Sequence, residues 1–359
     1  MIRNYLINRY LGKEFLKIVL NTSLIFFGLG IVMSLFEQIN FFKDFDVSFA
    51  LPITQTLLFV PSLLKEFFPF VILISGIWFF LKIKKTQELT AINTSGISNF
   101  YIIIIPSILS FIIGIFFITS LNPITSSLIK KYESIKGVYE KDQDYLAAIT
   151  ENGIWIKEKN YIIRSSHLKN KNLMEVTIYE MDDNNNFTKR IEAESADITS
   201  LIWILKNVKI INSEGSVLSE NIEQISYNSI YDIEKLKTLY SNVDTISFWN
   251  LGEQIKLYEE RGYSTKEMEI KLHKSFSFPF FLLSMLILSA FFTLGTNASD
   301  NNWTYVFLAI ISSILIFFFN DFSSALGKTE RLPVKISVWI PTAIVFLFSF
   351  VGIIHANQK

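Results

Sequence analysis

The sequence predicts a membrane protein with six transmembrane helices, three on each side of one large polar insertion that is built of β-strands. Half of the 359 residues are hydrophobic, 15% are aromatic and only 18% are charged, a high apolar content for a soluble chain of this length. The apolar residues gather at the two ends of the chain, whereas most acidic residues lie between them. Within the polar middle, apolar and polar residues alternate with period two, which is typical of strands.

Six apolar segments are each long enough to form a transmembrane helix, because roughly 20 helical residues cross the hydrocarbon core of a bilayer. The first is too long for the hydrophobic region of a secretory signal, and no small-residue cleavage site follows it, so we expect it to be retained. The segments are residues 15–36, 57–81, 100–121, 276–294, 303–319 and 338–354.

Basic residues in short loops predict the orientation, since Lys and Arg are enriched on the cytoplasmic side. The N-terminal segment is basic, and Lys82, Lys84 and Lys85 follow the second apolar segment. Strict alternation then places both termini in the cytoplasm and the polar insertion outside it. The chain is thus predicted to consist of residues 1–121 with three spans, an outer domain over residues 122–275, and residues 276–359 with the other three spans.

The outer domain is predicted to be all-β. Residues 147–211 alternate with period two, as at 153–157 and 175–179, and Asn- and Asp-rich turns separate the alternating runs. Short strands joined in this way favour a sandwich or jelly roll. Residues 132–144 and 249–274 have a helical, charged pattern and are predicted to flank the domain as stalks. The chain has no cysteine, which excludes disulfides, thiol catalysis and a Cys-x-x-Cys metal site.

The sequence predicts neither a catalytic residue nor a metal or cofactor site. Gly327, Lys328 and Thr329 match the end of a phosphate-binding loop, but the glycine required five positions earlier is Phe322. The three histidines are scattered without metal-ligand spacing, and no Gly-x-Ser-x-Gly motif is present. A net charge of zero also argues against nucleic acid as the main partner. Any ATP-driven work is therefore expected to come from another chain.

Five charged residues in or near the membrane are candidates for contact with a lipid. Lys65 and Glu66 interrupt the second apolar segment, where an ionisable group costs on the order of 3 kcal/mol unless it faces protein or water. They either line a lumen or snorkel outward. Lys130, Lys131 and Lys136 follow the third span on the outer side, against the usual bias of basic residues. They either bind a lipid phosphate or form a solvated helix face, because glutamates lie among them.

The cytoplasmic stretch at residues 86–96 is compatible with a short helix, and Gly96 suits its C-cap. A rigid helix in that place is suited to docking into a groove of a partner protein. Many helical loops would give the same pattern, so the stretch alone does not identify the partner.

Several short motifs occur in a fixed order along the chain. They are Arg9-Tyr10-Leu11-Gly12-Lys13, Phe67-Phe68-Pro69, Glu88-Leu89-Thr90-Ala91 with Ser95-Gly96, Gly153-Ile154-Trp155, and Asp321. In this order, around three helices on each side of a β insertion, they resemble the LptF/LptG permease family, the membrane portion of the lipopolysaccharide exporter. The resemblance covers the whole chain, and the first and last motifs are more similar to LptG than to LptF.

The resemblance implies a function, a location and a set of partners. The chain would be a permease subunit of an ABC-type exporter in the bacterial inner membrane, with its jelly roll in the periplasm, and not an enzyme. It would pair with an LptF-like permease and two copies of an LptB-like cytoplasmic ATPase, which binds ATP and Mg. It would take lipopolysaccharide from the outer leaflet of the inner membrane and pass it to LptC- and LptA-like periplasmic bridge proteins.

The resemblance also assigns site residues. The helix near residues 86–96 would be the element that couples the chain to the ATPase. Basic residues beyond the third span and on the first outer loop would lie near the phosphates of the lipid. The ATPase-coupling residues would then be Glu88, Leu89, Thr90, Ala91, Ser95 and Gly96, and the lipid-binding residues Lys43, Lys65, Glu66, Lys130, Lys131 and Lys136.

The sequence departs from the family at the outer end of the first helix, where Ser34, Asn40 and Phe41 stand at positions that carry lysine in better-known members. This implies a less anionic lipid. Three other classes stay open from the sequence: the LptF-type partner permease, a secondary transporter, and a membrane-anchored protein that binds lipid without moving it. Glu66, between Pro61 and Pro69, is the feature that suits a secondary transporter.

Overall fold

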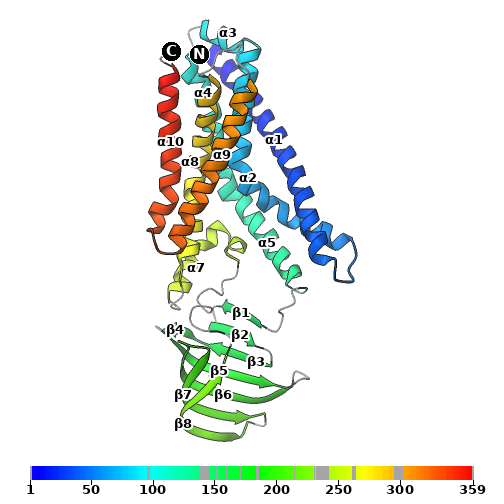
Figure 1. The fold of residues 1–359 in the computed structure, drawn as a ribbon, viewed down its shortest axis with the longest axis vertical. Coiled ribbons are helices and arrows are strands. Elements are labelled where there is room, and N and C mark those ends of the chain that lie inside the picture. The colour runs from blue at the N-terminus through cyan, green and yellow to red at the C-terminus, as the bar shows by residue number, and fades with distance from the viewer. Residues whose placement is uncertain are drawn as a thin grey trace. The chain divides into compact units, whose positions relative to one another are not determined.

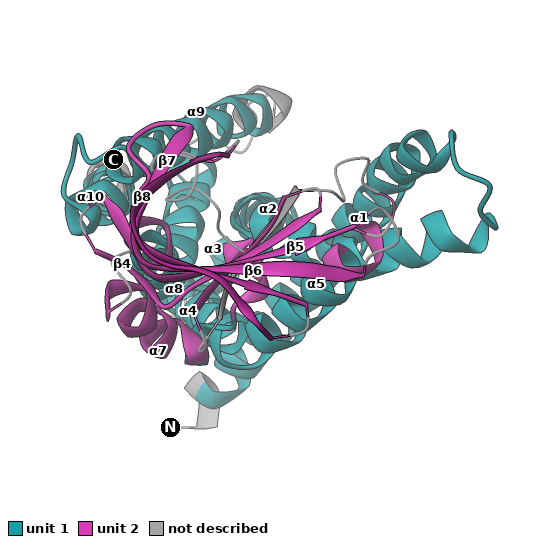
Figure 2. Ribbon diagram, turned by 90° about the horizontal axis from the view of Figure 1, so that it is seen from below, with its two compact units in different colours: residues 1–132, 247–249, 269–359 teal, residues 133–246, 250–268 magenta. Residues whose placement is uncertain are grey.

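The computed structural model divides the chain into two compact units, shown in different colours in Figure 2. The first, here called the helical unit, comprises residues 1–132, 247–249 and 269–359, and the second, the β unit, comprises residues 133–246 and 250–268. The structure describes residues 2–94, 98–137, 139, 145–150, 153–158, 160–169, 171–182, 186–213, 215–229, 231, 242–260, 264–294 and 302–357.

Within the described residues, six helical spans are long and apolar enough to cross a membrane. All six predicted apolar segments lie within helices of these spans, so this part of the predicted fold is confirmed. The helices that contribute to the helical unit (Figure 1) are α1 (Ile2–Phe42), α2 (Ala50–Lys85), α3 (Glu88–Thr94), α4 (Asn99–Phe116), the π-helix η1 (Phe117–Leu121), α5 (Asn122–Lys136), α8 (Lys266–Leu294), α9 (Asn302–Lys328) and α10 (Val334–Asn357).

The first three spans are much longer than a bilayer is thick. α1 has 41 residues and α2 has 36, while α4, η1 and α5 together form a span of 37 residues. At about 1.5 Å per residue, a helix of this length measures about 54 Å, nearly twice the hydrocarbon core. The three spans therefore extend beyond the hydrocarbon region. The predicted segments, chosen for apolar content alone, covered the central parts of α1 and α2 and the first part of the third span.

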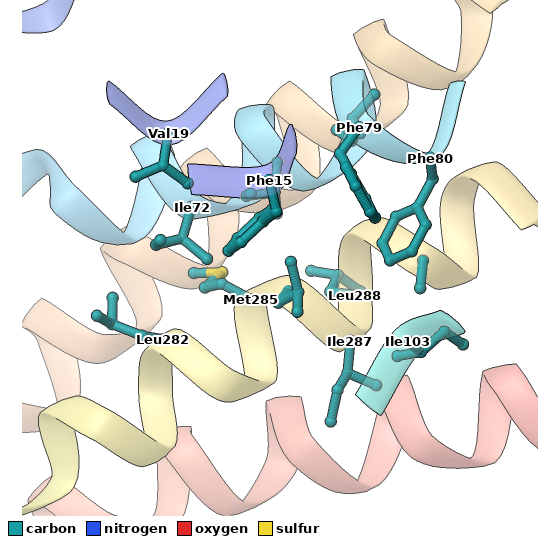
Figure 3. Close-up of a cluster of buried hydrophobic side chains, with 14 of the residues drawn as sticks. Phe15, Val19, Ile72, Phe79, Phe80, Ile103, Leu282, Met285, Ile287 and Leu288 are labelled. Carbon is teal, nitrogen blue, oxygen red and sulfur yellow. The ribbon is translucent and has the colours of Figure 1, made fainter. Parts of the chain in front are cut away.

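The core of the helical unit forms where α1, α2, α4 and α8 meet. Figure 3 shows members of this buried cluster: Phe15 and Val19 of α1, Ile72, Phe79 and Phe80 of α2, Ile103 of α4, and Leu282, Met285, Ile287 and Leu288 of α8. In the 18-residue apolar stretch of α8, 67% of the residues are buried, compared with 17% in the corresponding stretch of α9. α8 is therefore the central helix of the unit, and α9 is peripheral.

Two glycines let α8 approach its neighbours closely. A Cβ atom at Gly76 of α2 would overlap the side chain of Ser289, and one at Gly114 of α4 would overlap the backbone of Pro279. In a membrane, lipid tails are as apolar as leucine, so close backbone packing through small residues contributes much of the stability of helix pairs. The apolar composition of these helices places them in the membrane, and the glycines determine which helix faces pack together.

The β unit contains an eight-stranded sheet in which every pair is antiparallel. The order is β1-β2-β3-β5-β6-β7-β8, and β4 pairs with β5 beside this path. The sheet is strongly curved, as both views show (Figures 1 and 2). This agrees with the predicted all-β insertion. The strands are β1 (Tyr145–Thr150), β2 (Gly153–Glu158), β3 (Tyr161–Ser165), β4 (His167–Lys169), β5 (Asn172–Met181), β6 (Phe187–Asp197), β7 (Ile202–Asn212) and β8 (Val217–Asn228).

One face of the sheet forms the core of the β unit. Ile154 and Ile156 alternate with exposed or half-buried neighbours on β2, and Trp203 of β7 is fully buried. The Trp203 indole Nε1 donates a hydrogen bond of 2.6 Å to the carbonyl of Tyr231, so the polar edge of this large side chain is satisfied. Gly153 opens β2 with a positive φ of 116°, and a Cβ there would overlap the carbonyl of Ser165.

Two predicted boundaries differ from the structure. The helical pattern at residues 249–274 corresponds to two helices, α7 (Phe248–Glu260) and the start of α8 at Lys266, preceded by the 3₁₀ turn η2 (Val243–Thr245). Thr265, which directly precedes α8, is a residue type favoured at the N-cap, and residues 261–263 lie outside the described part. β8 lies beyond the predicted β region because its side chains are mostly exposed and carry no apolar alternation.

Candidate functional site

The candidate site is the end of the helical unit that carries α3, here called the α3 end. It contains the first turns of α1, the last turn of α2, α3 and the start of α4 (Figure 1). Thr86 closes α2, since its backbone N–H and its hydroxyl both donate to the carbonyl of Lys82 at 3.0 Å. Gln87 follows with a positive φ of 58°, and α3 begins at the next residue. The tight reversal places α3 directly against the end of the bundle.

α3 has one side that packs on the core and one side that is exposed. Leu89 and Ile92 pack against the hydrophobic core of the helical unit, whereas Thr90 and Ala91 are exposed. Glu88 is half-buried at the first turn. Ser95 and Gly96, the other two predicted coupling residues, lie outside the described residues. The exposed side of α3 therefore carries small side chains.

Three side-chain contacts join the first turns of α1 to its neighbours at the α3 end. The Tyr10 hydroxyl donates to Glu88 Oε2 of α3 at 2.9 Å. The Lys82 ammonium of α2 donates to Glu14 Oε2 at 2.5 Å. The Tyr101 hydroxyl of α4 donates to Asn8 Oδ1 at 2.8 Å. Between these contacts, the Leu11 and Phe15 side chains of α1 are fully buried. The first turns of α1 are therefore fixed to α2, α3 and α4.

No role was predicted for these α1 residues, although Arg9-Tyr10 belongs to the motif that resembles the family. A local signal does exist, because Ile7, Leu11 and Phe15 repeat at the spacing of one helix face, and Glu14 is acidic within a basic segment. The partners, however, lie 78 residues from Tyr10 and 68 residues from Glu14 in the sequence. No pattern within one segment predicts such pairs.

The six predicted lipid-binding residues lie on three elements. Lys43 is exposed in the connection between α1 and α2, while Lys65 is half-buried and Glu66 exposed within α2. The remaining three lie on α5: Lys130 and Lys131 are exposed, and the half-buried Lys136 belongs to the β unit. On α5, the buried side chains are those of Asn122, Thr125, Ser126, Ile129 and Tyr132. Lys130 and Lys131 thus lie on the exposed side of that helix.

A second polar cluster, here called the Tyr132 cluster, lies at the other end of the helical unit. It consists of Ser34 and Gln38 of α1, Gln55 of α2 and Tyr132 of α5, each at most 3% exposed. Gln38 Nε2 donates to the Tyr132 hydroxyl at 3.3 Å, and Gln55 Nε2 donates to the Tyr132 carbonyl at 3.2 Å. The Tyr132 ring stacks on Phe59 with a centroid distance of 5.0 Å. This cluster holds α1, α2 and α5 together, and no pattern in the sequence predicted it.

Ser34 explains one departure from the family pattern in physical terms. Its side chain is 1% exposed, and its hydroxyl has no hydrogen-bond partner within the described residues. A lysine in this place would bury an ammonium group one helical turn from Gln38, which is costly without a charged partner. Asn40 is exposed and Phe41 half-buried, so these two positions have room for a longer side chain.

In the β unit, two titratable groups are perturbed. Burial raises the pKa of Tyr227 well above its usual range, and the nearby Glu158 carboxylate acts in the same direction. Hydrogen bonds from the Thr199 hydroxyl and backbone N–H lower the pKa of the Asp197 carboxyl. Within the described residues, no three His, Cys, Asp or Glu side chains are grouped as metal ligands would be. These perturbed groups are explained by local packing and turn geometry.

Taken together, the six helices long and apolar enough to span a membrane, the inserted antiparallel sheet and the short helix on the α3 end define a polytopic membrane protein with an inserted β domain. The chain belongs to the lipopolysaccharide export system permease LptF/LptG family, whose model matches residues 9–355. It is therefore a multi-pass protein of the inner membrane and a transporter subunit.

Two relatives support this assignment over nearly the full length of the chain. The lipopolysaccharide export system permease protein LptG of Haemophilus influenzae is 20% identical over 353 residues, which cover 94% of this chain and 95% of that protein. The protein of the same name from Escherichia coli K12 is 19% identical over 351 residues, which cover 96% of each chain. The predicted resemblance to the family is thereby confirmed.

Proposed function

We propose that the chain is the LptG-type permease subunit of an ABC-type exporter that extracts lipopolysaccharide from the outer leaflet of the inner membrane and passes it to a periplasmic bridge. A separate cytoplasmic ATPase, present in two copies, supplies the energy by binding ATP and Mg and hydrolysing ATP. An LptF-like permease is its partner in the membrane, and LptC- and LptA-like proteins receive the lipid. The observation that carries this proposal is the family match over residues 9–355, together with α3 at the end of the bundle.

The geometry of α3 supports ATPase docking. A helix of seven residues is too short to be stable alone, so its position depends on Leu89 and Ile92 in the core and on Glu88 at its start. The exposed Thr90 and Ala91 present a small surface that a groove on another protein can enclose. Lys82, Lys84 and Lys85 end α2 beside this helix, which agrees with a cytoplasmic location.

The length of α2 is consistent with a position of the predicted lipid-binding residues near the outer leaflet. If the hydrocarbon begins at Leu81, the roughly 20 residues that cross it end near Pro61. Lys65 then lies about 6 Å inside the outer boundary, close enough for its ammonium to reach the lipid headgroups. On α1, roughly 20 residues counted from Phe15 end near Leu35. The Tyr132 cluster and Lys43 then lie at or beyond the outer boundary. The lipid phosphates of the outer leaflet are expected at this level.

Extraction requires an energy source because the acyl chains leave the bilayer. Each CH₂ group that moves from hydrocarbon into water costs about 0.8 kcal/mol, so one chain of twelve carbons costs roughly 10 kcal/mol if it is fully exposed. A protein surface that keeps the chain shielded removes most of this cost. The exposed apolar residues of the first three spans provide apolar surface of the kind that is required.

A secondary transporter is the main alternative class, and the geometry of α2 disfavours it. Such proteins bind substrate at helices that are broken near the middle of the membrane. α2 contains Pro61 and Pro69 on either side of Glu66, but it runs as one helix from Ala50 to Lys85. Pro106, Pro279 and Pro341 also lie inside helices. An unbroken α2 favours a subunit driven by another chain.

Charge reversal at the start of α3 tests the proposal. The full chain is purified with its native partner subunits, the bound subunits and lipid are identified by mass spectrometry, and the complex is reconstituted in vesicles. Glu88→Lys should lower ATP-dependent lipid release at least tenfold, because it reverses the charge on the docking helix. Glu253→Lys on the exposed side of α7 is the matched control and should have no effect. Purification without an ATPase, or full lipid release by Glu88→Lys, would overturn the proposal.

A further inference from the structure

Three attachments hold α3 on the rest of the helical unit, and they differ in how strictly they fix its orientation. The turn at Thr86 and Gln87 joins it covalently to α2, and Leu89 and Ile92 pack on the core. Apolar packing is not directional, so it allows α3 to slide or rotate over the core. The hydrogen bond from the Tyr10 hydroxyl to Glu88 Oε2, at 2.9 Å, is directional and ends on a carboxylate, which makes it stronger than a bond between neutral groups.

The Tyr10 side chain starts from a well-fixed backbone. Leu11 is fully buried on one side of it, and the ion pair between Glu14 and Lys82 lies one turn further along α1. The Tyr101 hydroxyl holds Asn8 on the preceding turn. A displacement of Glu88 is therefore resisted by the whole first part of α1 and not by one flexible side chain.

α1 itself is suited to carry such a displacement over a long distance. It is one helix of 41 residues, about 60 Å long, and its sequence contains no proline. α2 contains two prolines, and the third span contains Pro106 and the π-helix η1. Prolines and π-bulges are the usual places at which helices bend. The far part of α1 carries Ser34 and Gln38 of the Tyr132 cluster.

We infer that Tyr10 is the positioning residue through which a movement of α3 reaches α1, and that α1 transmits it to the Tyr132 cluster at the other end of the helical unit. This inference rests on the proposed function, in which the ATPase docks on α3. Tyr10 acts through Glu88 and touches neither nucleotide nor lipid. α2 remains the covalent connection of α3, whereas α1 is the element that converts movement at one face of the membrane into movement at the other.

The test uses the complex of the full chain with its native partner subunits in vesicles. Tyr10→Phe removes one hydroxyl and keeps the ring. Lipid released per ATP hydrolysed should fall about fivefold, the factor that the net contribution of one ordinary hydrogen bond produces in an equilibrium. Tyr5→Phe makes the same chemical change on an exposed residue of the same helix and should match the wild type. In the background of Glu88→Ala, Tyr10→Phe should add nothing.

A distance measurement distinguishes the transmission of movement through Tyr10 from an effect of Tyr10 on the stability of the chain. The chain has no cysteine, so two engineered cysteines accept spin labels without background. Phe36→Cys on α1 and Phe322→Cys on α9 both replace exposed residues, and ATP should change the distance between the two labels. Tyr10→Phe should reduce this change, with the resting distance preserved.

The outcomes distinguish the inference from the proposed function. If the wild type releases no lipid with ATP, the proposed function fails. If the wild type is active and Tyr10→Phe matches it in both readouts, only the role of Tyr10 is wrong. A further loss when Tyr10→Phe is added to Glu88→Ala would show that Tyr10 acts by a route other than Glu88, and would also overturn the inference.

Discussion

Replacing Gly76 by alanine should destabilise the helical unit through one defined collision. A Cβ atom at this position would lie 2.8 Å from Ser289 Cβ and 3.0 Å from Leu286 Cδ1, and would overlap the Ser289 hydroxyl. Ser289 and Leu286 are fully buried on the central helix α8, so neither side chain has space to move away. Overpacking of this kind costs about 1–3 kcal/mol. We expect Gly76→Ala to lower the midpoint of thermal unfolding by several degrees.

The reciprocal substitution on α8 isolates the cause. Ser289→Gly removes two of the three atoms that the new methyl group meets, Ser289 Cβ and Oγ, at a cost of about 1 kcal/mol for a glycine inside a helix. Combined with Gly76→Ala, it should restore most of the lost stability, so the double variant should be less destabilised than the sum of the two single variants by about 1–2 kcal/mol. Unfolding of the purified full chain in detergent, followed by its tryptophan fluorescence, measures all three variants.

Gly28 provides the matched control, because an added Cβ there meets no atom within 4 Å. Gly28→Ala should be neutral or slightly stabilising, since alanine is the better helix former by about 1 kcal/mol. The reasoning is refuted if Gly76→Ala unfolds at the temperature of the wild type, or if the effects of Gly76→Ala and Ser289→Gly are additive.

Three further predictions concern orientation, lipid contact and the β unit. A maleimide that cannot cross the inner membrane should label Ser219→Cys in the β unit but not Thr90→Cys on α3, if the two lie on opposite sides. Lys130→Gln with Lys131→Gln should weaken binding to anionic lipid vesicles about tenfold or more, at about 1 kcal/mol for each lysine. Asp197→Ala should destabilise the chain by about 1 kcal/mol at pH 7 and by less near pH 3, as thermal unfolding at both pH values will show.

The sign of the pH effect follows from the lowered pKa of the Asp197 carboxyl. The hydrogen bonds from Thr199 stabilise the ionised form, so their contribution is complete above the ordinary pKa of about 3.9 and is lost as the pH falls through the lower folded value. An equal difference at both pH values would contradict this.

For the lysines, Lys256→Gln on the exposed side of α7 is the control. Equal labelling of both cysteines in intact cells would exclude the proposed orientation.

Much of the fold was predictable because the hydrocarbon core of a bilayer permits few kinds of secondary structure. Apolar runs longer than about 20 residues have few alternatives to a transmembrane helix, and all six were found. Strands with one buried face were predictable from alternation, as at Ile154 and Ile156. β8 was not, because its exposed side chains are free to be polar or apolar without period. The long ends of α1 and α2 were missed for a related reason, since they leave the hydrocarbon and no longer need an apolar composition.

The candidate site was predictable only in its local part. The stretch that forms α3 was visible because residues 86–96 are compatible with a short helix and end at a glycine. The contact of Tyr10 with Glu88 spans 78 residues, and the contact of Gln38 with Tyr132 spans 94. Such pairs depend on how the helices pack, which the periodicity of single segments does not specify. The roles of Glu88 and of the six charged residues near the lipid stay predictions until they are tested.

The position of α8 has a consequence for biogenesis. α8 fills the centre of the helical unit, yet the ribosome makes it only after the polar insertion that follows α5. At about 5–20 residues per second, the roughly 130 intervening residues take on the order of ten seconds to synthesise. During that interval, α1, α2 and α4 are already in the bilayer without the helix that Gly76 and Gly114 are shaped to receive. These helices therefore stay incompletely packed during synthesis, and lipid or the insertion machinery must cover the surfaces of α2 and α4 that later contact α8.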